Sequence, residues 1–227
     1  MRRAVALSLA IVAAAWFVAP VRAQGPDDNL SIYAVKVVKK TPFREQFTGH
    51  GIYLGQGAVL TAAHNIGRWG FLKNPRVRIA DQELPARIVS EGSAELDVTL
   101  LTVDETRLPV SLRLRRNPLC KQPSKVGASV VVISPDRAAR TQIMSPLFAP
   151  PEIRRKFNTL ISELVGASGS GVFDAQTKCL LGIISRRVDR YGHQNGEGTY
   201  TPASASYAGY FVPASQIADF IPREFRF

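Results

Sequence analysis

The chain is divided into many short segments of β type, and almost none of it has the periodicity of a long amphipathic helix. These segments are rich in apolar residues and end at Gly, Pro, Asn or Asp, which is the pattern of strands joined by tight turns. We expect strands at 32–38, 51–53, 58–61, 77–79, 86–89, 98–102, 130–133, 159–161, 171–173, 180–185 and 210–212. Two small β-barrels need about this number of strands, so the predicted fold class is all-β.

The segments between the strands indicate how the chain is organised. A stretch at 108–123 is rich in Pro and Arg and lacks periodicity, so we interpret it as the link between two halves. Near the end, Pro213 can begin a helix, Ile217, Phe220 and Ile221 share one face, and Pro222 ends it. We therefore expect an N-terminal segment at 24–31, a first barrel at 32–108, a connector at 109–119, a second barrel at 120–212, and a short C-terminal helix and tail at 213–227.

The first residues have the features of a secretory signal peptide. Arg2 and Arg3 precede an apolar run at 4–18, and the small residues that a signal peptidase reads follow at Val21 and Ala23. We predict a signal peptide at 1–23 with cleavage after Ala23, and hence a secreted or periplasmic protein; an uncleaved anchor is the alternative. No later stretch reaches about 18 uninterrupted apolar residues, so the mature chain is expected to be soluble.

The charge balance indicates which partners to expect. The chain has 29 Lys and Arg against 18 Asp and Glu, and removal of Arg2, Arg3 and Arg22 leaves 26 minus 18, or +8. This excess favours contact with an anionic envelope surface, although a solvated basic surface is the simpler explanation. No Lys/Arg run is interleaved with aromatic residues, so we expect no specific nucleic acid partner.

The chain has two cysteines, Cys120 and Cys179. An even number of cysteines in an exported protein predicts a disulfide, the alternative being two separate buried thiols. The three histidines have no paired spacing and no calcium loop is present, so no metal site is expected.

Three strings along the chain supply the groups of a serine nucleophile system. His64 ends Thr-Ala-Ala-His, Asp97 precedes the apolar run 98–101, and Ser168 lies in Gly-Ala-Ser-Gly-Ser-Gly at 166–171. A serine hydroxyl attacks a carbonyl only when a neighbouring imidazole takes its proton and a carboxylate orients that imidazole. The sequence therefore predicts catalytic roles for His64, Asp97 and Ser168. The order His, Asp, Ser excludes the α/β-hydrolases, in which the serine comes first.

Each of these residues also has a structural alternative. Asp97 could cap a strand, and the segment around Ser168, with Ser162 and Ser170 nearby, could be a plain Gly/Ser loop. The other histidines, His50 in a strand-like run and His193 in a polar loop, are expected to be structural or to face the solvent.

The chain resembles the trypsin/chymotrypsin-like serine peptidases, and within them the compact secreted bacterial branch that includes the glutamyl endopeptidases. The resemblance rests on 48–64, 97–101, 166–173 and 181–185, which occur in the family's order. It implies two six-stranded antiparallel β-barrels of chymotrypsin type and an endopeptidase that works without a cofactor. It also implies protein or peptide substrates, and we expect a monomer.

The resemblance further implies the roles of individual residues. The amides of Gly166 and Ser168 would form the oxyanion hole, and Cys120 and Cys179 would staple the second barrel. Animal digestive enzymes have an acidic residue in place of Ala167, so activation by pairing with a new N-terminal amine is not expected here.

The family's specificity pocket would be formed by residues on either side of the nucleophile, namely Ser162, Glu163, Ser185, Arg186 and Arg187. Ser162 replaces the aspartate of trypsin-type pockets, so the sequence gives no support for a simple trypsin-like preference. Glu163 could recognise a basic side chain and either arginine an acidic one, or these charges could neutralise one another. The Thr and His of glutamyl-specific pockets are not evident here, and the alternative for both arginines is a position at the rim or in solvent.

Two classes of function follow from the sequence. The first is an exported serine endopeptidase that forms an acyl-enzyme. The alternative is a weakly catalytic or non-catalytic binding protein that uses its basic surface on the same scaffold. An esterase would share the acyl-enzyme chemistry of the first class.

Overall fold

The structure is a computed structural model that describes residues 28–40, 45–67, 75–93, 95–148, 160–162, 167–189 and 206–226 of the chain. The predicted signal peptide at 1–23 lies outside these residues. Within them, no helix is both long enough and apolar enough to cross a bilayer.

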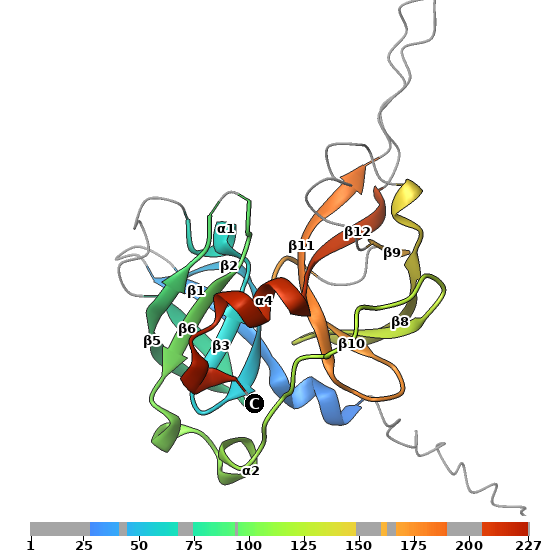
Figure 1. The fold of residues 1–227 in the computed structure, drawn as a ribbon. Coiled ribbons are helices and arrows are strands. Elements are labelled where there is room, and N and C mark those ends of the chain that lie inside the picture. Colours follow the sequence, from blue (N-terminus) through green and yellow to red (C-terminus); the bar gives the residue numbers. More distant parts are fainter. Residues whose placement is uncertain are drawn as a thin grey trace, which may run out of the picture.

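The first half of the chain forms a closed antiparallel barrel (Figure 1). Its strands are β1 (Ala34–Lys40), β2 (Glu45–Gly55), β3 (Ala58–Thr61), β4 (Arg76–Ile79), β5 (Gln82–Glu91) and β6 (Thr99–Val103). Their order around the barrel is β1-β2-β3-β6-β5-β4, and pairing of β4 with β1 closes it.

The second half forms another closed barrel with the same number of described strands. Its strands are β7 (Ser129–Ser134), β8 (Arg137–Met144), β9 (Leu160–Ser162), β10 (Gly171–Asp174), β11 (Leu180–Asp189) and β12 (Ser206–Pro213). The order is β10-β11-β12-β9-β8-β7, and pairing of β7 with β10 closes the barrel. The prediction of two six-stranded antiparallel barrels is therefore confirmed.

Strand β8 is the one described strand that the sequence analysis missed. Its sequence, Arg-Ala-Ala-Arg-Thr-Gln-Ile-Met, is short of the β-branched and aromatic residues that predict strands, and most of its residues are at least partly exposed. Its pairing with β7 and β9 makes it a strand despite this composition.

The apolar core is continuous between the two barrels. One cluster of buried residues contains Ile52 and Leu60 of the first barrel together with Phe173 and Val212 of the second. Strand β7 alternates between this cluster and a second one, because successive side chains of a strand point to opposite faces. The barrels are therefore held face to face by burial of apolar surface.

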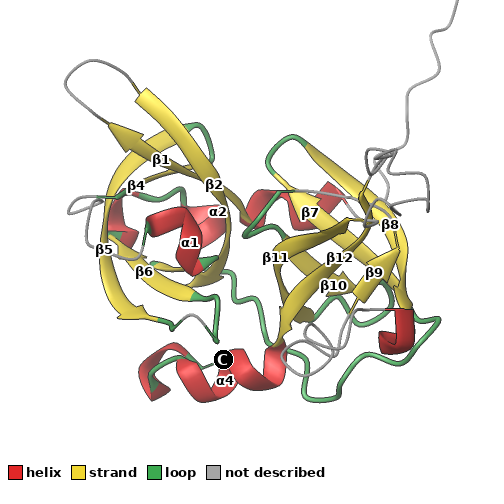
Figure 2. Cartoon of the chain, turned by 90° about the horizontal axis from the view of Figure 1, so that it is seen from above, coloured by secondary structure: helices red, strands yellow, loops and turns green. Residues whose placement is uncertain are grey.

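Short helices connect the barrels and end the chain. The connecting segment contains a 3-10 helix at Glu105–Arg107 and α2 (Val110–Arg113); further 3-10 helices lie at Asp28–Tyr33, Pro146–Phe148 and Arg223–Phe225. Helix α4 (Ala214–Phe220) follows Pro213, as predicted, and runs from the second barrel back toward the first (Figures 1 and 2). Its buried Ile217 belongs to the shared core.

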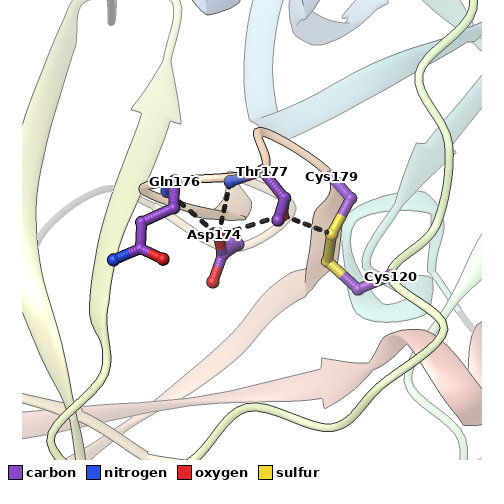
Figure 3. The surroundings of a disulfide bond; sticks show 5 residues. All are labelled: Cys120, Asp174, Gln176, Thr177 and Cys179. Carbon is purple, nitrogen blue, oxygen red and sulfur yellow. Dashed lines mark hydrogen bonds between the residues drawn. A yellow bond between two sulfur atoms is a disulfide. The ribbon is translucent and has the colours of Figure 1, made fainter.

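A disulfide joins Cys120 to Cys179, which confirms the predicted pair (Figure 3). The turn before Cys179 is held by Asp174, whose Oδ1 accepts hydrogen bonds from the backbone N–H of Gln176 and Thr177 at 3.0 and 2.7 Å. The disulfide fixes the segment that follows the connector to the hairpin between β10 and β11.

Candidate active site

His64 lies in α1 (Ala63–Ile66), a single helical turn directly after β3. Ala62 and Ile66 are buried against the first barrel, whereas the side chain of His64 is 36% exposed. The small alanines before His64 allow the turn to lie close to the barrel, so the imidazole projects outward where a substrate can reach it.

Asp97 lies just before β6 and binds His64 with both carboxylate oxygens. Oδ2 is 2.8 Å from Nδ1 of His64, and Oδ1 accepts a hydrogen bond from the His64 backbone N–H at 3.1 Å. The second bond fixes the backbone of α1, so the carboxylate sets both the position and the ring orientation of the imidazole.

Asp97 is buried, with 6% of its surface exposed, and Ser185 in β11 donates a hydrogen bond from Oγ to its Oδ2 at 2.5 Å. Burial by itself raises the pKa of Asp97, but the hydrogen bonds from His64 and Ser185 outweigh burial and hold this pKa below 3.8. The side chain is therefore ionised at neutral pH, as an orienting carboxylate must be.

A β-bulge explains how Ser185 reaches Asp97. The pairing of β11 with β12 shifts register between Ile184 and Arg186, and a bulge of this kind changes the direction of a side chain. The sequence predicts Ser185 only as a residue of the specificity pocket and gives no signal for this contact, because the bulge depends on pairing with a distant strand.

Ser168 lies in the turn before β10 and is partly exposed. Its Oγ donates a hydrogen bond to the backbone carbonyl of Ser185 at 2.9 Å. Ser185 therefore contacts Asp97 through its side chain and Ser168 through its backbone, which brings all three predicted catalytic residues to one place. Within the described residues, the Ser168 hydroxyl bonds to Ser185 and not to His64.

The backbone of Ser168 is fixed from the first barrel. Its carbonyl accepts hydrogen bonds from the backbone N–H of His50 at 2.9 Å and from Nδ2 of Asn65 at 3.0 Å. Within the described part of the chain the Ser168 N–H donates to no acceptor, which leaves it available to an oxyanion. Asn65 was not predicted as a residue of the site. Its position directly after His64 in the sequence was the one signal that could have identified it.

A cavity of about 240 Å³ opens beside the imidazole. It is lined by Ala63, His64, Gly67, Glu91, Gly92, Ser93, Asp97 and Arg186. His64 and Asp97 thus border a space that can receive part of a ligand.

The remaining predicted site residues are placed less completely. Gly166 and Glu163 lie outside the described residues, as does His193. Ser162 lies in β9 and pairs with Ala208 of β12, and Arg187 lies in β11 and pairs with Gly209 of β12. Arg186 borders the cavity. Among the described residues, no group of three His, Cys, Asp or Glu side chains could hold a metal ion.

A second His and Ser pair has to be distinguished from this site. Nδ1 of His50 is 3.0 Å from Oγ of Ser170, but His50 is 5% exposed and Ser170 is 0% exposed. A substrate carbonyl cannot reach a hydroxyl that is fully buried, so Ser168 and not Ser170 is the candidate nucleophile.

The arrangement of barrels is that of the trypsin-like serine proteases. No family model matches the sequence, and no curated protein matches it. Solved structures do match: a zinc complex of kallikrein-related peptidase 10 has a TM-score of 0.60 at 19% identity, covering 86% of this chain and 96% of that one. The active form of the Rv3671c protease from M. tuberculosis has a TM-score of 0.56 at 19% identity, covering 85% and 80%.

A third structure, the MamO protease domain from Magnetospirillum magneticum, has a TM-score of 0.55 at 18% identity and covers 85% of this chain and 97% of that one. These likenesses establish that the chain has the trypsin-like serine protease fold, as the sequence analysis expected.

Proposed function

We propose that this chain is an exported serine peptidase that cleaves peptide bonds through an acyl-enzyme intermediate. The observation that carries the proposal is the hydrogen-bonded pair of His64 and Asp97, placed so that Ser185 bonds to both Asp97 and Ser168. A base, an ionised carboxylate and a partly exposed hydroxyl in one cluster are what acyl transfer by serine requires.

In the proposed reaction, Oγ of Ser168 attacks the peptide carbonyl carbon while Nε2 of His64 takes the hydroxyl proton. His64 then gives this proton to the leaving amine, the C–N bond breaks, and the acyl group remains on Ser168. Water attacks next, again losing its proton to His64, and the proton returns to Ser168 as the acid leaves. Asp97 stabilises the imidazolium at both stages.

The first step requires one change from the structure described above. The Ser168 hydroxyl has to leave the carbonyl of Ser185 and turn toward Nε2 of His64. Catalytic hydrogen bonds of this kind commonly align only when a substrate is bound. The N–H groups of Ser168 and Gly166 are proposed to bind the oxyanion.

A fluorophosphonate probe, which reacts with activated serines, tests the proposal. We expect the wild-type protein to be labelled at one residue, Ser168→Ala to take no label, and Ser170→Ala to be labelled at saturation. His64→Ala should remove nearly all labelling. A folded wild-type protein that takes no label would favour the alternative, a binding protein on the same scaffold.

Two further parts of the proposal need their own measurements. Export is supported by Arg2, Arg3 and the apolar run that follows, and the mass of the purified mature protein should correspond to cleavage after Ala23. Because Ala167 precedes the nucleophile, activity should not depend on an additional internal cut. An activity that appears only after such a cut would contradict this.

Substrate preference is proposed for the pocket residues Ser162, Glu163, Ser185, Arg186 and Arg187. The position of Arg186 at the cavity beside His64 supports recognition of a carboxylate near the scissile bond. Cut sites in a proteome-derived peptide mixture should then be enriched in acidic residues, and Arg186→Gln should reduce that enrichment. Cleavage of simple esters without any peptide cleavage would indicate an esterase.

A further inference from the structure

The buried pair of His50 and Ser170 lies directly beneath the turn that carries Ser168. His50 belongs to β2 of the first barrel, and Ser170 immediately precedes β10 of the second. Their contact of 3.0 Å between Nδ1 and Oγ therefore connects the two barrels at the base of the candidate nucleophile. The reaction proposed above uses neither side chain.

The opposite edge of the His50 ring faces an ion pair. Nε2 is 3.7 Å from Oδ2 of Asp136, in the turn between β7 and β8, and Oδ1 of Asp136 accepts a bond from Nζ of Lys36 at 2.6 Å. The hydrogen bond from Lys36 holds the pKa of Asp136 below 3.8, so this group remains a carboxylate. A carboxylate near Nε2 favours the tautomer that has its proton there, and Nδ1 then accepts the Ser170 hydroxyl.

Burial keeps the imidazole of His50 neutral. Desolvation lowers the pKa of His50, Asp136 opposes this shift, and Lys36 adds to it, with desolvation the largest effect. A neutral ring can accept the Ser170 hydroxyl at Nδ1, whereas a protonated ring cannot.

The backbone of His50 is bonded to the same turn. Its N–H donates to the carbonyl of Ser168 at 2.9 Å, and its carbonyl accepts a hydrogen bond from Oγ1 of Thr61 at 2.6 Å. Nδ2 of Asn65, the neighbour of His64, donates to the same Ser168 carbonyl and to Oγ1 of Thr61. The position of Ser168 relative to the base is therefore determined by groups that meet at His50.

The turn has little room to move against this support. Gly169 has a φ of +88°, and a Cβ atom there would lie 1.9 Å from the carbonyl oxygen of His50. The amide of Gly169 also donates to Ile184 at 2.7 Å. A shift of His50 would thus be transmitted directly to the residue that follows Ser168.

We infer that His50 is a positioning residue for Ser168, and that it acts through its side-chain hydrogen bond to Ser170. The inference rests on the proposed serine peptidase function. Loss of the bond should let the turn move by a fraction of an ångström, which lowers the rate of attack by Ser168 without changing how ligands bind. A misplacement of about 1 Å can cost about 100-fold in rate, so this smaller shift should cost at most that much.

The test compares variants of His50 and Ser170 in the fluorophosphonate reaction, with the limiting rate and the half-saturating probe concentration measured separately. We expect His50→Leu and Ser170→Ala each to lower the limiting rate by about 10- to 100-fold and to leave half-saturation unchanged. The double variant should be labelled no more slowly than the slower single variant, because the two substitutions remove the same hydrogen bond. His50→Asn keeps an amide near the place of Nδ1 and should recover most of the rate.

A control separates positioning from loss of stability. Leu84 is 1% exposed in the core of the first barrel and lies in β5, so Leu84→Ala should lower the free energy of unfolding and leave the labelling rate unchanged. The inference is wrong if His50→Leu is labelled at the wild-type rate, if the single-variant effects multiply in the double variant, or if rates simply follow the free energy of unfolding across all variants.

Nitrogen-15 NMR of the imidazoles provides a readout that does not depend on catalysis. We expect a neutral His50 with its proton on Nε2 at pH 7 in the wild type, and a change in its shifts in Ser170→Ala. If the wild type takes no label but shows this tautomer, the peptidase proposal fails while the bond to Ser170 is established. A His50 that is protonated at pH 7, or is insensitive to Ser170→Ala, would refute the inference itself.

Discussion

Replacement of both cysteines by serine should cost about 4 kcal/mol of the free energy of unfolding. The disulfide joins residues separated by 59 positions, and the chain-entropy relation for a loop of this length gives about 14 cal/mol/K. At 25 °C this entropy corresponds to the stated free energy. It acts on the unfolded chain, which gains freedom when Cys120 and Cys179 are no longer linked.

The native structure around the disulfide should survive this change. The backbone N–H of Cys120 donates to Leu180 at 2.9 Å, the N–H of Leu180 donates to Pro118 at 2.9 Å, and Asp174 holds the turn before Cys179. These bonds do not depend on the sulfur atoms. The folded double variant should therefore be labelled by the fluorophosphonate at a rate close to that of the wild type.

The assay is equilibrium unfolding in urea for the wild type, the double serine variant and a double alanine variant. With a slope of about 2 kcal/mol per M, the midpoint should fall by about 2 M in both variants. A loss of less than about 1 kcal/mol, with the same secondary structure, would refute the entropic reasoning. A folded double variant that is labelled much more slowly would show instead that the disulfide supports the nucleophile turn.

Three other predictions concern the site. Asp97→Asn should slow labelling by about 10⁴-fold, because an amide no longer selects the right tautomer of the base. The pKa of Asp97 is held below 3.8, so its carboxylate stabilises the wild-type fold at neutral pH, and this contribution should disappear as the pH falls below that value. Asp97→Asn lacks the contribution at every pH, which urea unfolding at several pH values would show. Ser185→Ala removes a bond to a buried carboxylate worth about 1.5–3 kcal/mol and should raise the pKa of Asp97 in a carbon-13 NMR titration. Gly169→Ala should abolish labelling, because its Cβ would collide with the carbonyl oxygen of His50. Gly127 has a similar φ of +80° but open space around its Cβ, so Gly127→Ala should lower the free energy of unfolding in urea by only about 1 kcal/mol. Equal effects of the two variants on labelling and on unfolding would contradict the contact with His50.

The fold was largely predictable because every described barrel strand except β8 has a local signal. The segment at 58–61 is mostly apolar and follows a turn at Gly57, and β3 has these bounds in the structure. Strand β8 has no such signal, because Arg137 and Arg140 suit an exposed strand whose existence depends on its neighbours. Local patterns predict strands that form part of the core and fail for strands that tertiary pairing imposes.

The site was predictable only as far as its motifs extend. His64, Asp97 and Ser168 lie in strings with a recognisable chemistry, and the structure brings them together around one residue of β11. The hydroxyl of Ser185 on Asp97 and the imidazole of His50 on Ser170 join positions 88 and 120 residues apart. Such contacts depend on a bulge and on the docking of the barrels, which no local pattern encodes.

The place of β12 has a consequence for synthesis on the ribosome. This strand lies between β11 and β9 but is made after both, so the second barrel has two open edges until β12 has emerged. Unpaired edges favour aggregation, and the half-made barrel is the stage at which a chaperone would be needed most. The imidazole and its carboxylate are synthesised long before then, but the hydroxyl that they would activate is rigidly supported only after β12 has been added to the barrel.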